Sequence, residues 1–366
     1  MRQSVKFIMG LSVLAFLGSC KKSDSIPSYS VPSTYNFSNA DSLTAKTTLS
    51  MLAEMEIAIN KSNTANTVVS SSQLRSMFSN QGSFFTDTTF NSNTLHLNTS
   101  GVQLKNQTVT SAQAYMEIML DSIGIASQSV LPASNGVAGV SSRKTLLSAN
   151  GVYWRQLFTK SMMGILIGHL ITDVYLTDSL NANIITTAKQ HAWDNAFFLW
   201  CVPANFPSNR ANVKYWGSYT SQIDSGAIKP VVTMTGVNSN TTLLNAFLKG
   251  RAALANNDNA TAQTQAAIII AMFEKLEAAA ALHETNEATG NIPNGAAAVA
   301  GNMSESLGFW MALKFNTKRK IISDTQINTI LALYGTNFYN ITPANIDSIR
   351  NAISAIYGWD SVKSYL

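Results

Sequence analysis

The sequence predicts an all-α fold, a single-domain helical bundle that follows a flexible tether. In nearly every regular segment, apolar residues recur every three to four positions, as in amphipathic helices. The one strand-like stretch is residues 229–235. A body of about 330 residues can bury roughly three quarters of its unfolded surface in one core. These observations favour helices packed on helices.

Residues 1–19 have the three parts of a bacterial export signal: a basic start, an apolar core over residues 7–16, and the small residues Gly18 and Ser19 before Cys20. The apolar core is too short to span a bilayer, which takes about 20 apolar residues. An ordinary secretory peptide is the alternative. Leu-Gly-Ser-Cys, however, is the lipobox pattern, so we expect cleavage before Cys20 and lipidation of its thiol.

The chain after this cysteine divides into a tether, residues 20–34, and a helical domain, residues 35–366. The tether is rich in Ser and Pro and poor in apolar residues, which predicts flexibility. A lipid anchor holds such a protein at a membrane surface while its body stays in water. We therefore expect a cell-envelope protein, an outer-membrane lipoprotein that faces the periplasm or the cell surface.

The charge and the cysteine content argue against a nucleic-acid-binding protein and against a domain stabilised by disulfides. Without the signal the chain has 23 basic and 20 acidic residues, and no basic cluster is longer than Lys318-Arg319-Lys320. Nucleic-acid binding is therefore not expected. With Cys20 lipidated, Cys201 has no intramolecular partner, so the domain has to rely on its core rather than on a disulfide.

The first half of the domain contains four predicted helices, residues 42–60, 111–123, 153–176 and 184–200. Leu49, Leu52, Met55 and Ile59 form the apolar stripe of the first. Thr110 is a suitable N-cap for the second. The third is the most apolar, and its Gly164 and Gly168 share one face, which indicates close approach of another helix. The fourth stops before Pro203. Between the first two lies a polar stretch, residues 79–107, which is either a functional loop or poorly ordered.

The second half contains five more predicted helices, residues 243–254, 260–287, 304–315, 324–334 and 343–357. Residues 256–259 join the first two as a pair, and the Ala-rich composition of 260–287 allows tight packing. A break rich in Gly, Asn and Pro, residues 290–296, separates this pair from the rest. Thr342 and Pro343 are typical of the N-cap and first residue of the last helix.

A series of short sequence strings resembles one family of lipoproteins from Bacteroidota and related bacteria, known as domain of unknown function 4856. The strings, in chain order, are Tyr35-Asn36-Phe37, Lys160 with Met163-Gly164, His191 to Phe197, Tyr215-Trp216-Gly217, Ala246-Phe247 with Gly250 to Ala253, and Ser304-Glu305 with Gly308-Phe309. One departure from the family pattern is Asn195, where the family has Glu, and this removes a carboxylate from that helix.

The resemblance implies an all-helical fold akin to imelysin-like proteins, which are envelope proteins linked to iron acquisition. The imelysin signature Gly-x-His-x-x-Glu is not present, because Gly168 directly precedes His169 and the next carboxylate is Asp173. The iron link is therefore an analogy of fold.

His169 and Asp173 are the first candidate metal ligands. They are four residues apart, so they face the same side of the most apolar helix. They could bind one metal ion or hydrogen-bond to each other. Because two ligands do not complete a metal site, the hydrogen bond is the preferred interpretation.

The candidate ligand-binding residues are His191, Asp194, Arg251, His283 and Glu305. The two histidines and two carboxylates could converge on a cavity if their helices pack around one axis. Arg251 stands between Gly250 and two alanines, which leaves its side chain room to reach inward and bind Glu305 or Asp194 bidentately. A buried structural ion pair is the preferred interpretation for Arg251, ahead of a ligand clamp.

Four common catalytic motifs do not occur: Gly-x-Ser-x-Gly, His-Glu-x-x-His, the Walker phosphate-binding loop and Cys-x-x-Cys. No catalytic residue is assigned. The six tryptophans could line a glycan groove, but the apolar residues around each favour the core.

The leading hypothesis is a membrane-anchored envelope lipoprotein that binds a ligand without enzymatic activity, in metal, iron or nutrient acquisition. This function requires no cofactor, and binding of a divalent metal ion or iron is compatible with it. The expected partners are the membrane, through the lipid, and a small ligand or envelope protein. The alternatives are an enzyme with a His/carboxylate site in the bundle and a structural partner in an envelope complex.

Overall fold

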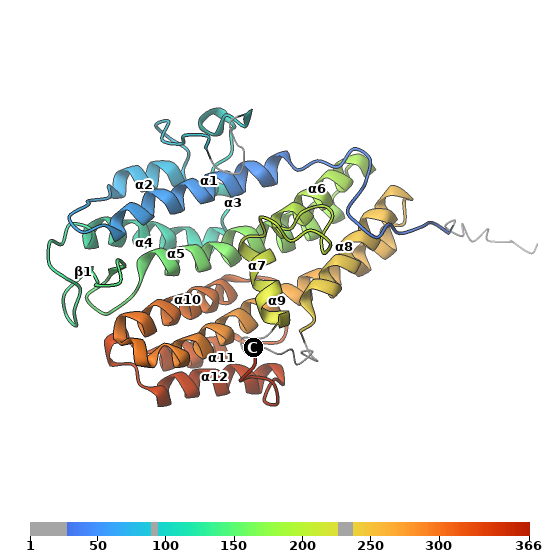
Figure 1. Cartoon of the computed structure of the whole chain (residues 1–366). Helices are drawn as coiled ribbons and strands as arrows, with labels where there is room; N and C mark the ends of the chain where they lie inside the picture. Colours follow the sequence, from blue (N-terminus) through green and yellow to red (C-terminus); the bar gives the residue numbers. More distant parts are fainter. Residues whose placement is uncertain (1–27, 89–93, 226–236) are drawn as a thin grey trace, which may run out of the picture.

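The computed structural model describes residues 28–88, 94–225 and 237–366, and in these it confirms the all-α prediction (Figure 1). The only sheet in the described residues is a hairpin of two-residue strands, in which Gly139 pairs with Leu147. The predicted signal, the lipidation site Cys20 and the strand-like stretch 229–235 lie outside the described residues.

The first half of the domain runs from α1 to α6. Its α-helices are α1 (Leu43–Asn60), α2 (Ser71–Phe78), α3 (Leu104–Gln107), α4 (Gln113–Ala126), α5 (Trp154–Met162) and α6 (Thr186–Leu199). Three short 3-10 turns lie between these helices: η1 (Lys61–Asn63), η3 (Leu97–Thr99) and η4 (Thr110–Ala112). The hairpin consists of β1 (Gly139–Val140) and β2 (Leu146–Leu147). Helix α5 continues as two π-helical segments, η5 (Met163–Gly168) and η6 (Leu170–Ser179).

The second half runs from α7 to α12. Its α-helices are α7 (Tyr215–Ser225), α8 (Ser239–Ala255), α9 (Asn259–Gly290), α10 (Ala296–Phe315), α11 (Asp324–Tyr334) and α12 (Pro343–Tyr357). Two 3-10 turns, η7 (Ile292–Asn294) and η8 (Phe338–Asn340), lie in its connections.

The helices stack in layers, with α1 and α2 outermost, then α4 and α5, then α9 and α10, and finally α11 and α12 (Figure 1). The long helix α9 is central because it packs extensively against both α8 and α10, and α10 in turn packs against α5. One contiguous core of buried apolar side chains runs through these layers.

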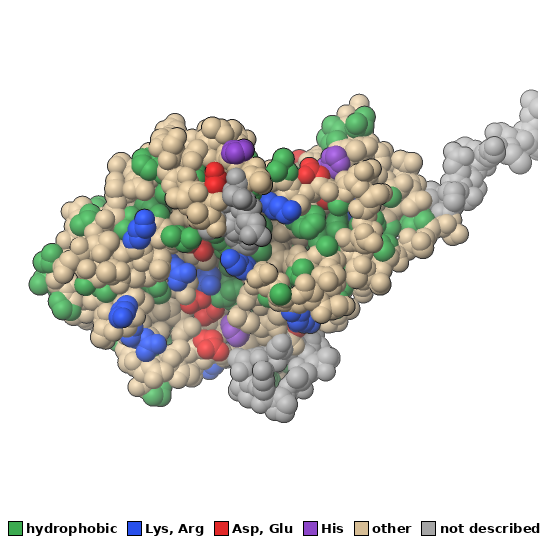
Figure 2. All heavy atoms as spheres, turned by 45° about the horizontal axis from the view of Figure 1, so that its top comes forward, with side chains coloured by type: hydrophobic (Ala, Val, Ile, Leu, Met, Phe, Trp, Pro, Cys, Tyr) green, Lys and Arg blue, Asp and Glu red, His purple; other side chains and the backbone are tan. Residues whose placement is uncertain are grey.

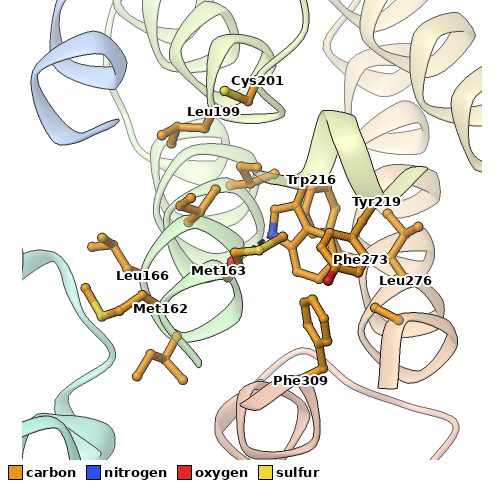
Figure 3. Close-up of a cluster of buried hydrophobic side chains, with 14 of the residues drawn as sticks. Met162, Met163, Leu166, Leu199, Cys201, Trp216, Tyr219, Phe273, Leu276 and Phe309 are labelled. Atoms are coloured by element: carbon orange, nitrogen blue, oxygen red, sulfur yellow. Dashed lines mark hydrogen bonds between the residues drawn. The ribbon is translucent and has the colours of Figure 1, made fainter. Parts of the chain in front are cut away.

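The helix from α5 through η6, Trp154–Ser179, forms the middle of the core. It is long and apolar enough to cross a membrane by length and composition, but 83% of its most apolar window is buried inside the protein. A Cβ on Gly164 would lie 2.1 Å from the Cβ of Ala312 on α10. The close helix approach predicted from this glycine is therefore confirmed, and Figure 3 shows the apolar cluster around Met162 and Met163.

The predicted helices agree with the observed ones, with differences at some ends. Thr110 is not an N-cap: it begins a 3-10 turn, and α4 starts at Gln113 without a side-chain cap. The helix expected to begin at Ser304 begins two turns earlier at Ala296, because the break ends at Gly295, whose φ of 87° closes it. The N-cap of α12 is confirmed, since Thr342 accepts a hydrogen bond from the Asn345 backbone N–H.

The polar stretch 79–107, as far as it is described, is held to α1 by one buried carboxylate. Glu54 accepts hydrogen bonds from the backbone N–H groups of Thr86 and Thr88, at 2.5 and 3.0 Å. Asn98 also bonds to both the N–H and the C=O of Phe85. The described part of this stretch is therefore a packed loop rather than a poorly ordered one.

The end of the predicted tether also makes a specific contact. Within residues 28–34, the hydroxyl of Tyr29 donates to Asp258 Oδ2 at 2.9 Å, and Asp258 is the N-cap of α9. The next tyrosine, Tyr35, bonds through its backbone N–H to the carbonyl of Ala204. The chain is thus attached to the bundle before α1 begins.

Candidate functional site

A cavity of about 1090 Å³ opens among five helices, α1, α5, α7, α9 and α10. Figure 2 shows Lys or Arg, Asp or Glu, and His side chains gathered in a recess near the middle of one face. A cavity of this size, with both signs of charge, is the default candidate for a binding site in a protein of this length.

Helical spacing explains how each wall presents its side chains. From the first two helices come Glu56, Ile57 and Asn60 of α1 and Arg155, Thr159 and Lys160 of α5. From the others come Tyr215, Ser218, Tyr219 and Gln222 of α7, His283, Glu284 and Glu287 of α9, and Asn302 and Glu305 of α10. Positions three or four apart lie on one helix face, so each helix turns one row of polar residues into the cavity.

The core beneath the cavity holds α7 in place. The indole Nε1 of Trp216 donates to the carbonyl of Met163 at 2.7 Å, and Figure 3 shows this bond in the middle of the apolar cluster. The ring of Tyr219 packs edge-on against Phe309, with centroids 4.6 Å apart. Since Met163 and Tyr219 also line the cavity, its floor is the surface of the core.

Two glutamates of the cavity wall share the hydroxyl of Tyr219. This hydroxyl lies 2.6 Å from Glu284 Oε1 and 3.0 Å from Glu305 Oε2. Glu305 is also paired with Lys160 at 3.1 Å and accepts a bond from Gln156 at 2.7 Å. These contacts fix the position of the Glu305 side chain on the cavity wall.

The Tyr219 hydroxyl has one hydrogen, so it can donate to only one of the two carboxyl groups. The other contact requires a proton on a carboxyl group. Glu284 is the one that holds it, because burial and the neighbouring charge of Glu305 raise its pKa. With this proton on Glu284, the hydroxyl of Tyr219 is free to donate to Glu305.

The cavity also contains buried polar atoms without hydrogen-bond partners. In the described residues these include Glu56 Oε1, Arg155 Nε, Thr159 Oγ1 and His283 Nδ1. Burial raises the pKa of Glu56, although the nearby Arg155 and Lys160 oppose this rise. Burial lowers the pKa of His283, so its ring is neutral near pH 7. Buried polar groups normally have partners, so these atoms are available to bond a ligand or solvent that fills the cavity.

The structure brings together two of the five candidate ligand-binding residues. His283 and Glu305 line the cavity. Asp194 and Arg251 instead form a pair in the core between α6 and α8, with Arg251 Nε 2.7 Å from Asp194 Oδ1 and both side chains buried. Asp194, and not Glu305, is thus the partner of Arg251. His191 is half-buried on α6 and does not line the cavity.

His169 and Asp173 lie at a separate place, with His169 Nδ1 3.5 Å from Asp173 Oδ1. Asp173 also accepts hydrogen bonds from Thr172 and Thr317, and these neighbours lower its pKa despite its burial. No group of three or more His, Cys, Asp or Glu residues within the described ranges could hold a metal ion. This pair is a side-chain contact at 3.5 Å within one helix, and the shorter hydrogen bonds of Asp173 come from the two threonines.

Several cavity residues were not identified from the sequence. Glu56 and Arg155 are single charges on helices predicted only by their apolar stripes, and Tyr215 and Tyr219 belong to α7, which was not predicted. The pattern Tyr-x-x-x-Tyr places both tyrosines on one helix face and was the available signal. Tryptophans do not line the cavity, and Trp193, Trp200, Trp216 and Trp310 are fully buried.

Comparison with known proteins gives a family but no activity. A family model described as a domain of unknown function (DUF4856) matches residues 32–360. Neither the curated proteins nor the solved structures contain a significant match. The site therefore has to be interpreted from its own geometry.

Proposed function

The chain belongs to the family described as domain of unknown function DUF4856, and we propose that it is a non-enzymatic binding protein for a small polar ligand. The observation that carries this proposal is the set of unpartnered atoms in the cavity, on Glu56, Arg155, Thr159 and His283. A ligand that supplies hydrogen bonds to these atoms removes the cost of leaving buried polar groups unsatisfied. Nutrient capture is the role that fits such a cavity.

Ligand binding is tested by blocking the cavity. We expect a member of a library of sugars, amino acids, nucleotides and organic acids to raise the unfolding temperature of the wild type. At a concentration of 100 times Kd, the gain in stability is about 2.7 kcal/mol. Ser218→Trp places an indole in the cavity and is expected to abolish this gain. The measurement is thermal unfolding with and without each compound.

The matched control is Ser348→Trp, on the exposed side of α12, which keeps the full response. A library without a stabilising compound contradicts the proposal. So does a compound that stabilises the Ser218→Trp variant as much as the wild type, because it binds elsewhere.

We further propose that this binding takes place in the envelope, with the protein held at the outer membrane through lipid on Cys20. The support is the sequence before this cysteine, an export signal that ends in Leu-Gly-Ser. Replacing the thiol removes the lipid attachment point, so Cys20→Ser is expected to move the protein from the membrane fraction to the soluble fraction. Fractionation followed by immunoblotting checks this, and a variant that stays with membranes as the wild type does overturns the lipid anchor.

An enzyme remains the second candidate because of one observation, the contact of two carboxyl groups with one hydroxyl. Glu284, whose pKa is raised by burial, and Glu305 share Tyr219 on one cavity wall, which is the arrangement of a general acid beside a base. The binding experiment decides between the candidates when the bound compound is recovered. An unchanged compound supports binding alone, and a chemically altered one supports catalysis.

A further inference from the structure

We infer that the ligand of this cavity is a neutral, hydroxyl-rich molecule, an oligosaccharide, whose neighbouring hydroxyls bind Glu56 and Arg155. This inference rests on the proposed function and adds the chemical class of the ligand. It is carried by three features of the cavity: two charged groups of opposite sign, the balance of formal charge, and an aromatic ring without an aromatic partner.

The first feature is the pair of charged side chains, Glu56 on α1 and Arg155 on α5. Both line the cavity, and Arg155 lies near enough to Glu56 for its charge to oppose the rise of the Glu56 pKa on burial. Glu56 Oε1 lacks a donor, and Arg155 Nε–H lacks an acceptor. A hydroxyl group both donates and accepts, so two adjacent hydroxyls of one sugar ring satisfy both residues at once.

The second feature is the balance of charge. The cavity contains the cations Arg155, Lys160 and Lys214 and four glutamates, so neither sign of charge dominates its lining. A ligand with a strong charge of either sign would meet groups of its own sign there, which is unfavourable. A neutral ligand has no such cost.

Other polar groups extend the same surface. Thr159 and His283 are buried, and each presents an atom without a partner to the cavity. Sixteen of the twenty lining residues carry a polar or charged group, so hydrogen-bonding partners are available on each of the five helices. The volume of about 1090 Å³ is at the upper end of the range for small-molecule sites, so more than one sugar ring fits.

The third feature is Tyr215, the first residue of α7. Its ring lines the cavity, and in the described residues it has no aromatic neighbour, unlike the ring of Tyr219. Its φ of 45° is left-handed, an uncommon conformation for a bulky residue that is found more often at functional sites. Its hydroxyl lies beside Glu56. The apolar C–H face of a sugar ring can pack on this aromatic ring while its hydroxyls reach Glu56 and Arg155.

The test is direct binding to the purified lipid-free domain, residues 28–366, or to the full chain in detergent. The probes are an array of neutral di- to hexasaccharides, a second set of amino acids and dipeptides, and a third of inorganic phosphate and acetate. Hits are titrated by calorimetry. We expect binding by at least one neutral oligosaccharide and by neither of the other two sets.

Variants locate the site and the contacts. Arg155→Met and Glu56→Gln are each expected to weaken oligosaccharide binding about tenfold or more, because each removes a hydrogen bond with a charged partner. Tyr215→Ala is expected to weaken it as well. The matched control, Arg143→Met, replaces an exposed arginine in the β1–β2 hairpin and leaves the affinity unchanged. Circular dichroism and unfolding midpoints verify that each variant is folded, and Glu56→Gln keeps the shape of the side chain.

The outcomes separate this inference from the proposed function. If amino acids, dipeptides or anions bind in the cavity and oligosaccharides do not, the ligand class is wrong while the binding function stands. If oligosaccharides bind but folded Arg155→Met and Glu56→Gln variants bind them equally well, the inference is overturned. If none of the three sets binds, the inference fails, and the wider library with the Ser218→Trp variant decides whether the binding function fails with it.

Discussion

Replacing Asp194 with Asn is expected to destabilise the protein by about 3–5 kcal/mol, because it leaves the charge of Arg251 buried without a partner. Arg251 is 1% exposed and Asp194 is fully buried, and their Nε–Oδ1 distance is 2.7 Å. Asparagine keeps the shape of the aspartate side chain and one of its two acceptor oxygens. The loss of stability therefore reports on the lost charge rather than on packing. Urea unfolding of the wild type and the variant gives the difference in free energy.

The same carboxylate also holds the segment before α1. The hydroxyl of Tyr35 donates to Asp194 at 2.7 Å, and the backbone N–H of Asp41 donates to it at 3.2 Å. The ring of Tyr35 stacks on Phe197 with centroids 3.6 Å apart. We therefore expect Asp194→Asn to make this segment more sensitive to limited proteolysis in addition to lowering global stability.

The double variant Asp194→Asn with Arg251→Met is the control for this interpretation. It removes the unpaired cation, and the one amide oxygen still accepts from Tyr35 or Asp41 as it does in Asp194→Asn, so it should be more stable than Asp194→Asn alone. A double variant that is less stable than the single one would contradict the explanation by buried charge. A loss below about 1 kcal/mol in Asp194→Asn would contradict it too, because a loss of that size corresponds to one ordinary hydrogen bond.

The helices could be predicted from the sequence where their signals are local. The segment 324–334 matches α11, and Thr342 with Pro343 begins α12 as expected, because capping and periodicity depend on residues within one or two turns. The start of α10 was missed because the run from Ala296 to Ala300 is Ala-rich and has little contrast between apolar and polar faces. In α7, Gly217 and the two tyrosines hide the helical period in a short segment.

The site could be predicted only in part, because a cavity depends on which helices become neighbours. His283 and Glu305 were identified as acid–base groups on the correct helices, and both line the cavity. Asp194 and Arg251 have the same chemistry, but their helices pair away from it. Glu56 and Arg155 lie 99 positions apart in the sequence, and no local pattern shows that α1 packs beside α5.

Global stability is also expected to fall as the pH rises from 6.5 to 8, because of carboxyl groups that are protonated in the folded state. Burial raises the pKa of Glu277 to about 8 from its ordinary value of 4.5, and burial also raises the pKa of Glu284. Between the unfolded and folded pKa values the native state binds more protons than the unfolded chain. Stability therefore falls with rising pH by up to about 1.4 kcal/mol per pH unit for each group.

Other titrating groups set the pH range in which the buried glutamates determine how stability changes. Burial lowers the pKa of His283 from 6.5, so below that pH the unfolded chain takes up a proton that the native state does not, and stability falls with acid. Burial raises the pKa of Cys201 to about 12 from 9.0, which adds a further dependence above pH 9. From pH 6.5 to 8, therefore, the buried glutamates dominate the slope.

Glu277→Gln separates the contribution of one glutamate from the rest. The glutamine side chain is neutral at every pH, so the variant is expected to lose stability with pH less steeply, by up to about 1.4 kcal/mol per unit, and to gain on the wild type as the pH approaches 8. Urea unfolding at pH 6.5, 7, 7.5 and 8 measures both slopes. Asp178→Asn is the control, since Asp178 is exposed on η6 and its replacement should leave the slope unchanged. If stability changes with pH equally steeply in Glu277→Gln and in the wild type, Glu277 is ionised in the folded protein and this prediction is wrong. Its negative charge would then be stabilised by more than the hydrogen bond that it accepts from Asn316 at 2.8 Å.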